Sequence, residues 1–181
     1  VNYMNKFGSL FKLPQTTISK AMYIFHIISK QISFKNLNKF LYASACMFLV
    51  SKIDDFPKSL KHYVRAHEYL LNIFRLEHIK NLSESDQEIT FQDATVEGFK
   101  NYIVKSQVQT QCEEAIRSVE KDILYRIGYD LEIDLPYQYL DYWNQNNLLP
   151  SEEVYQAAYS YVTLSMKTLV PLYYEPRVIA L

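Results

Sequence analysis

The stretch from Phe40 to Val50 constrains the fold most strongly, because every residue in it is apolar except Ser44. A helix that is apolar on all its sides has to be buried on all its sides. We therefore expect residues 37–53 to form the central helix of a helical domain, with other helices packed around it. Phe56 and Pro57 should end this helix.

Apolar residues recur at steps of three and four along most of the remaining chain, which is the spacing of an amphipathic helix. Only three glycines are present, and this scarcity argues against both a turn-rich β architecture and phosphate-binding loops. The fold class predicted is all-α. The expected helices are 1–11, 14–31, 37–53, 58–79 (as one helix or two), 99–127, 136–145, 151–168 and one that starts at Pro176.

Two connections have a distinctive character. Gly128 follows the helix 99–127 at the place where a left-handed residue is favoured, and residues 129–133 should be extended. Residues 81–98 are acidic and contain no Lys or Arg, so we expect them to form an exposed loop.

Charge and composition exclude several function classes. The net charge is -1, which gives no reason to expect nucleic acid or an anionic membrane as the main partner. No apolar run approaches the roughly 18 residues of a membrane helix, and no secretory signal pattern is visible. The two cysteines, Cys46 and Cys112, do not form a disulfide framework, which fits a reducing, intracellular compartment.

Chemical motifs are also missing. The four histidines are not arranged as metal ligands, no cysteine pair has metal spacing, and no hydrolase or kinase signature is present. We therefore expect no metal, no cofactor and no small-molecule substrate. Asp54 and Asp55 are interpreted as a solvated helix end, and the basic stretch 58–69 as a solvated helix face rather than a nucleic-acid contact.

Lys52 and Glu120 are more informative charges. Lys52 lies at the end of the buried helix, and Glu120 borders an apolar stripe on the helix 99–127. A charge in such a setting usually needs a partner. Spacing by itself favours a structural ion pair or a lysine that extends from the helix end to solvent. The alternative is that the two groups are held at the rim of an apolar face and clamp the backbone of a partner protein.

Four segments in the same order resemble the cyclin family, and together they cover nearly the whole chain. Residues 48–56, which read FLVSKIDDF, resemble the core of a cyclin box, where an apolar helix ends in Ser-Lys, an apolar residue and two acids. Residues 119–131, which read VEKDILYRIGYDL, resemble the fifth helix of that box and its Gly-aromatic-Asp-Leu ending. Residues 13–15 and 24–26 look like parts of the second helix of the box, and residues 136–137 with 174–180 look like parts of a second box. The sequences of these segments are most similar to those of the transcription-type cyclins L, K and T.

The resemblance implies a cyclin fold. Residues 1–133 would form a first five-helix box whose first helix is cut short, and residues 134–181 would begin a second, incomplete box. It also implies a cyclin-dependent protein kinase as the partner, with no catalytic group contributed by this chain. The residues that match the family's kinase-binding positions are Lys52, Glu120, Leu49, Ile53, Leu124, Tyr129 and Leu131.

Some features depart from the family pattern, and two alternatives stay open. The His-Arg-Phe often seen in the second helix is His26-Ile27-Ile28 here, and the unfinished second box should expose apolar surface. One alternative is a cyclin-fold general transcription factor like transcription factor IIB, which would need a strongly basic surface. Another is a helical enzyme without a recognisable motif. Nuclear localisation is implied by the family only.

Overall fold

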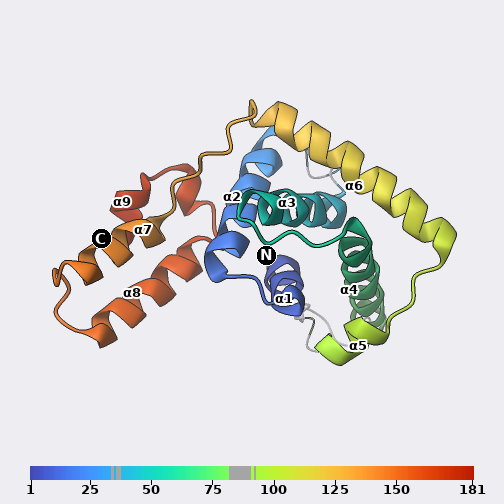
Figure 1. Cartoon of the computed structure of the whole chain (residues 1–181), viewed down its shortest axis with the longest axis horizontal. Coiled ribbons are helices and arrows are strands. Elements are labelled where there is room, and N and C mark those ends of the chain that lie inside the picture. Colours follow the sequence, from blue (N-terminus) through green and yellow to red (C-terminus); the bar gives the residue numbers. More distant parts are fainter. Residues whose placement is uncertain (34, 36–37, 82–90, 92) are drawn as a thin grey trace.

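The computed structural model describes all residues except 34, 36–37, 82–90 and 92, and it describes only the backbone of residues 79–81. Within that part of the chain there are nine α-helices, one short 3-10 helix and no strand, so the predicted all-α class is confirmed (Figure 1). The elements are α1 (Asn2–Phe11), α2 (Gln15–Gln31), α3 (Lys39–Ile53), α4 (Leu60–Asn81), α5 (Val96–Asn101), α6 (Ser106–Arg126), α7 (Pro136–Gln145), α8 (Glu152–Ser165), η1 (Val170–Leu172) and α9 (Pro176–Ala180).

Helix α3 is central, as its composition predicts. It packs against α1, α2, α4 and α6, and Ala45, Cys46 and Met47 in its middle are fully buried. The Asn38 side chain caps its first turn by accepting a hydrogen bond from the backbone N–H of Leu41, 3.3 Å away. The surrounding helices therefore take their positions from α3.

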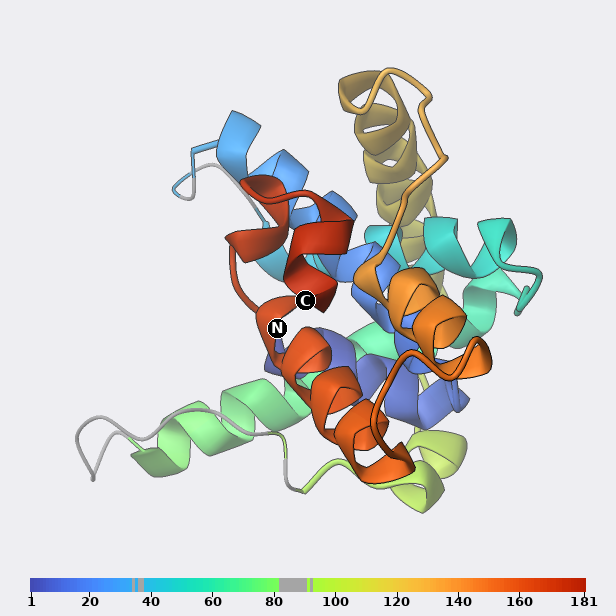
Figure 2. The same cartoon turned by 90° about the vertical axis from the view of Figure 1, so that its left-hand side faces the viewer.

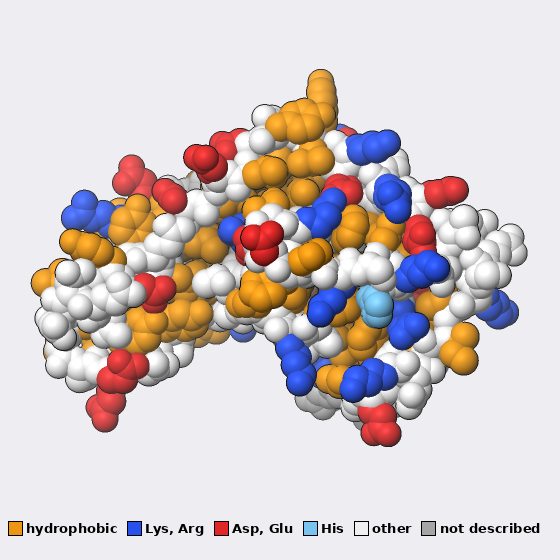
Figure 3. All heavy atoms as spheres, in the orientation of Figure 1, with side chains coloured by type: hydrophobic (Ala, Val, Ile, Leu, Met, Phe, Trp, Pro, Cys, Tyr) orange, Lys and Arg blue, Asp and Glu red, His pale blue; other side chains and the backbone are white. Residues whose placement is uncertain are grey.

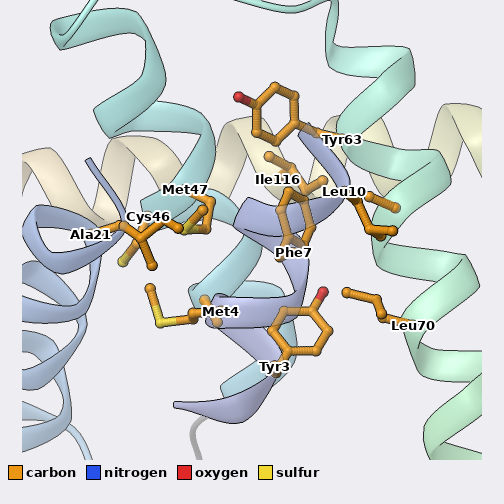
Figure 4. Close-up of a cluster of buried hydrophobic side chains, with 14 of the residues drawn as sticks. Tyr3, Met4, Phe7, Leu10, Ala21, Cys46, Met47, Tyr63, Leu70 and Ile116 are labelled. Carbon is orange, nitrogen blue, oxygen red and sulfur yellow. The ribbon is translucent and has the colours of Figure 1, made fainter. Parts of the chain in front are cut away.

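The first hydrophobic core fills the space between α1, α3 and α4 (Figure 4). Phe7 and Tyr63 stack there with ring centroids 5.6 Å apart, and each is fully buried. Burying one side chain of this size stabilises a fold by about 1.5–3 kcal/mol. Gly8 lets α1 approach α2 closely, because a Cβ at that position would lie 2.3 Å from the Cδ1 of Ile18. A small residue is thus needed where these two helices meet.

The helix expected at 99–127 was wrong at its start. Helix α6 begins at Ser106, and a separate short helix, α5, is capped by Thr95, whose side chain accepts from the N–H of Gly98 at 3.0 Å. Between the two helices, Tyr102 and Val104 pack against the first core while Ile103 is exposed. This inward–outward alternation belongs to extended chain and not to a helix.

The acidic loop expected at 81–98 was wrong in part. Helix α4 is one helix that continues to Asn81, and α5 already begins at Val96. Phe91 is buried at 3% exposure beside Tyr3 and Phe74, so this end of the segment is anchored in the core. The acidic residues 84, 86 and 88 lie outside the described residues.

Helices α7, α8 and α9 lie together (orange to red in Figure 2), and a second, smaller core lies between them. It contains Tyr137 and Met166, and α2 reaches both of them. The Ser19 Oγ and Tyr137 Oη atoms are 2.8 Å apart, and His26 Nε2 lies 3.2 Å from the carbonyl oxygen of Met166. Large apolar side chains on this part of the chain are exposed, as expected, among them Tyr142, Leu148, Tyr161, Leu164, Tyr173 and Val178.

The helices that carry Lys52 and Glu120 end in the same way. After α6, the N–H of Tyr129 donates to the carbonyl of Leu124 (2.9 Å), and Gly128 has a positive φ of 65°. After α3, the N–H of Phe56 donates to the carbonyl of Ser51 (2.8 Å), and Asp55 has a φ of 57°. Both are the left-handed termination that favours glycine, so the prediction for Gly128 is confirmed.

The substitution Gly128→Ala should lower the free energy of unfolding by about 1 kcal/mol, because a left-handed backbone is unfavourable for a residue with a Cβ. No heavy atom lies within 4 Å of the added Cβ, so the effect is a backbone effect without a clash. Urea denaturation followed by circular dichroism measures it. Asp55→Gly, at the equivalent position of α3, should shift stability in the opposite direction. Equal stability of Gly128→Ala and the unaltered chain would contradict the assignment.

Candidate functional site

The structure brings together Lys52 and Glu120, which are 68 positions apart in the chain. The Lys52 Nζ donates to Glu120 Oε1, which joins the end of α3 to the middle of α6, so the ion pair expected from the sequence is present. The Lys52 side chain is 43% exposed and that of Glu120 is 12% exposed. The Lys52 ammonium also lies 4.4 Å from the centre of the Phe48 ring, an attractive cation–π arrangement.

This pair keeps hydrogen-bonding capacity to spare. A lysine ammonium has three N–H donors, and one of them is used by Glu120. The second carboxylate oxygen of Glu120 adds an acceptor beside it. Because Lys52 is half exposed, the pair adds little to folding stability. Its spare donors and acceptor match the C=O and N–H groups of a peptide backbone.

The crossing of α3 over α6 is held on a second flank by Asp122. Its Oδ2 accepts from Tyr42 Oη at 2.8 Å and from Arg126 Nε at 2.7 Å. Residues two positions apart on a helix point to different sides, so Glu120 and Asp122 contact α3 from opposite flanks of α6. Partial desolvation opposes ionisation of Asp122, yet the hydrogen bonds from Arg126 and Tyr42 hold its pKa below the ordinary value. These contacts fix the angle at which Lys52 and Glu120 are presented.

The five apolar residues expected at this site differ widely in exposure. Leu49 is only 4% exposed and belongs to the first core, so in this conformation it offers little surface to a partner. Ile53, Leu124 and Leu131 are half-buried. Tyr129 is 67% exposed, and its backbone is fixed by the hydrogen bond to Leu124. A large aromatic side chain on a rigid backbone is typical of an interface anchor.

Two exposed aromatic side chains near these residues were missed from the sequence. Tyr125 lies on α6 about 7 Å along the axis from Glu120. Phe56 follows the end of α3. Position 125 falls off the apolar stripe of α6, which was the available signal for its exposure. In Figure 3 hydrophobic side chains gather by the C-terminal end of α6, with charged groups just below them.

The interpretation of Asp54 as a solvated helix end was wrong. Its side chain is 15% exposed, accepts from Thr17 Oγ1 at 2.8 Å and pairs with Lys20 Nζ at 2.5 Å. Asp54 therefore ties the end of α3 to α2. The backbone of Lys52 is thus held against α2 as well as against α6.

The interpretation of residues 58–69 as one solvated face was also wrong in part. Lys58, Lys61 and His62 are exposed, but Tyr63, His67 and Tyr69 are buried. His67 belongs to a polar cluster in the first core. Its Nδ1 lies 3.0 Å from Tyr3 Oη and 2.9 Å from Ser44 Oγ, and those two oxygens are 2.6 Å apart.

One grouping among the described residues resembles a metal ligand set, and it shares His67 with this polar cluster. One donor atom each of His67, Glu68 and Cys112 lies within 4.8 Å of the others. An imidazole, a carboxylate and a thiolate together suit zinc, provided that the thiol loses its proton. Burial, reinforced by Glu68 and Glu113, raises the pKa of the Cys112 thiol to about 12, so the thiol is protonated. Because the donors come from α4 and α6, no local motif reveals the grouping.

No helix in the described part of the chain combines the length and the apolar character that crossing a bilayer requires. The geometry is that of a helical scaffold that presents a charged pair at the border of an apolar surface.

Comparison with known proteins finds relatives that are named as cyclins. The chain is 22% identical over 179 residues to cyclin pch1 of Schizosaccharomyces pombe, a match that covers 99% of this chain and 46% of the relative. It is 24% identical over 176 residues to cyclin-K of Homo sapiens (96% and 25%), and 27% identical over 174 residues to the cyclin L homolog cyl-1 of Caenorhabditis elegans (94% and 34%). No family model matches the chain.

The chain is a distant homologue of the transcription-type cyclins over nearly its whole length, and the resemblance seen in the sequence is confirmed. It spans less than half the length of each of these three relatives.

Stability should fall on acidification through the His67 imidazole. Burial, with a smaller contribution from Arg75, lowers the pKa of His67 from 6.5 to about 4. Between these two values the unfolded chain binds the proton more readily, so the stabilisation is complete above pH 6.5 and is lost as the pH falls towards 4. The loss is about 3 kcal/mol.

Urea denaturation at several pH values measures this loss. The variant His67→Gln should flatten the pH dependence, whereas His62→Gln, which alters an exposed histidine of the same helix, should not. Parallel curves for all three proteins would show that His67 does not titrate in this way.

Proposed function

We propose that this chain is a regulatory subunit that binds and activates a cyclin-dependent protein kinase of the transcription-regulating kind. The relatives are named as cyclins, and the order of the cyclin-like segments is kept. The observation that carries the proposal is the Lys52–Glu120 pair, held at the rim of an apolar surface with free hydrogen-bonding capacity. The chain itself supplies no catalytic group.

In this proposal the docking face consists of Lys52, Glu120, Leu49, Ile53, Leu124, Tyr129 and Leu131. Its apolar members bury surface against the regulatory helix of the kinase and supply most of the affinity, while the charged pair sets the register. The bound kinase helix is then held so that the Lys–Glu ion pair and metal-binding Asp of the kinase are in place. Tyr125 and Phe56 extend the face on either side.

The division into two boxes is part of the same proposal. Residues 1–133 correspond to the first box and residues 134–181 to the beginning of the second. Two separate hydrophobic cores support this division, and Ile133 packs against both of them. A nuclear location follows for a subunit of such a kinase.

The alternative, a cyclin-fold factor that binds DNA and polymerase in the manner of transcription factor IIB, has less support. Such a factor would need an extended basic surface, and this chain carries a net charge of -1. Recovery of DNA or polymerase without a kinase would favour it.

Charge reversal tests the docking pair. Lys52→Glu and Glu120→Lys should each weaken kinase co-purification at least about tenfold, because each leaves a like-charge pair at the interface. They should also remove the kinase's activity on the heptad repeat of RNA polymerase II, while circular dichroism shows unchanged helical content. Lys121→Glu, an exposed neighbour on α6, is the matched control.

The double swap Lys52→Glu/Glu120→Lys separates docking from a purely structural role. The swap restores the internal ion pair with its polarity reversed. If the pair served only to hold α3 against α6, kinase binding should therefore recover. A docking role requires donor and acceptor at their original positions, so kinase binding should stay lost in the swap. Unchanged binding in both single variants, or full recovery in the swap, would refute the docking assignment.

A further inference from the structure

A basic hollow lies away from the docking pair, between the first half of α4, the end of α5 and the extended segment that leads into α6. Its volume is about 310 Å³, and three cationic side chains line it, Lys61, Arg65 and Lys100. Its remaining walls are mainly Tyr102, Ile103 and Val104. Figure 3 shows Lys and Arg side chains gathered on this part of the molecule, over α4.

The three cations have no anionic partner within the described chain. The described ion pairs involve Lys20, Lys52 and Arg126, and none includes a residue of the hollow. Arg65 is half-buried, and no carboxylate in the described part of the chain forms an ion pair with its guanidinium. No acidic side chain among the described residues lines the hollow, although the chain as a whole has a net charge of -1. A bound anion would relieve the mutual repulsion of the three charges.

The composition of the lining indicates which anion fits. A guanidinium offers a planar fork of N–H donors that matches phosphate oxygens, and the two lysines add point charges. A phosphoryl group carries nearly two negative charges at neutral pH, which suits three cations better than a single carboxylate does. We propose that this hollow binds a phosphorylated serine or threonine in a segment of a partner protein.

The apolar walls favour a peptide over a nucleic acid. Ile103 is 89% exposed at the edge of the hollow, beside half-buried Tyr102 and Val104. An apolar side chain next to the phosphorylated residue would cover them. Nucleic acid carries phosphates at regular intervals and is bound along a basic track, whereas these three cations line a single small hollow.

The proposal is tested with a labelled short peptide that has a central phosphoserine between two leucines in a glycine background. Versions with serine or glutamate at the centre are compared with it by fluorescence anisotropy on the whole chain. The phosphorylated peptide should bind at least about tenfold more tightly than the serine peptide, with the glutamate peptide weaker than the phosphopeptide. Arg65→Gln and Lys100→Gln should each weaken that binding several-fold.

Two further variants keep the outcome interpretable. Arg65→Lys retains the charge without the planar fork, so it should lose part of the affinity even where Arg65→Gln disturbs folding. Lys35→Gln removes an exposed lysine of the α2–α3 connection that does not line the hollow, and it should bind normally.

Equal binding of the serine and phosphoserine peptides, or an equal loss in Lys35→Gln, would overturn the proposal. Competition by inorganic phosphate as strong as by the phosphopeptide would reduce the hollow to a small-anion site. Tighter binding of a single-stranded oligonucleotide through the same residues would assign the hollow to nucleic acid. The hollow shares no residue with the docking pair, so these results are independent of kinase binding.

Discussion

The burial of α3 on all its sides is the constraint on which the rest of the structure depends. A helix without a polar face cannot border solvent, so α1, α2, α4 and α6 have to enclose it. The last turn of α3 reaches the surface, and Lys52 is carried there at a position fixed by the core. Glu120 on α6 and Asp54, which binds Lys20 of α2, then hold that turn from two directions. The candidate docking site is therefore built on a helix end that is held by both α2 and α6.

Most of the helices could be predicted, because their apolar residues recur at a helical period and their ends carry proline or glycine. The break before α6 could not. Its signal is the alternation of Tyr102, Ile103 and Val104 over only three residues, which is too short to compete with a helical pattern on both sides. The burial of His67 could have been predicted, since Tyr63, His67 and Leu70 lie on one helical stripe. Because His67 lies in a basic stretch, it was instead interpreted as part of a solvated helix face.

At the candidate site, single residues could be identified from the sequence, whereas a surface formed by several helices could not. Lys52 and Glu120 could be identified because each lies at the border of an apolar segment and within a cyclin-like motif. The low exposure of Leu49 follows from the burial of α3 that its composition predicts, and the exposure of Tyr125 follows from its position off the apolar stripe of α6, so both had a signal in the sequence. The basic hollow had none, because Lys61 and Arg65 share one face of α4 while Lys100 arrives from α5.

The position of α2 between the two cores has a consequence for how the chain can be divided. Ser19 and His26 lie on a helix of the first core, yet their polar atoms meet Tyr137 and Met166 of the second. A fragment that ended at residue 133 would leave the Ser19 hydroxyl and the His26 imidazole facing solvent, without the partners that Tyr137 and Met166 provide. The two cores would therefore unfold together as one cooperative unit.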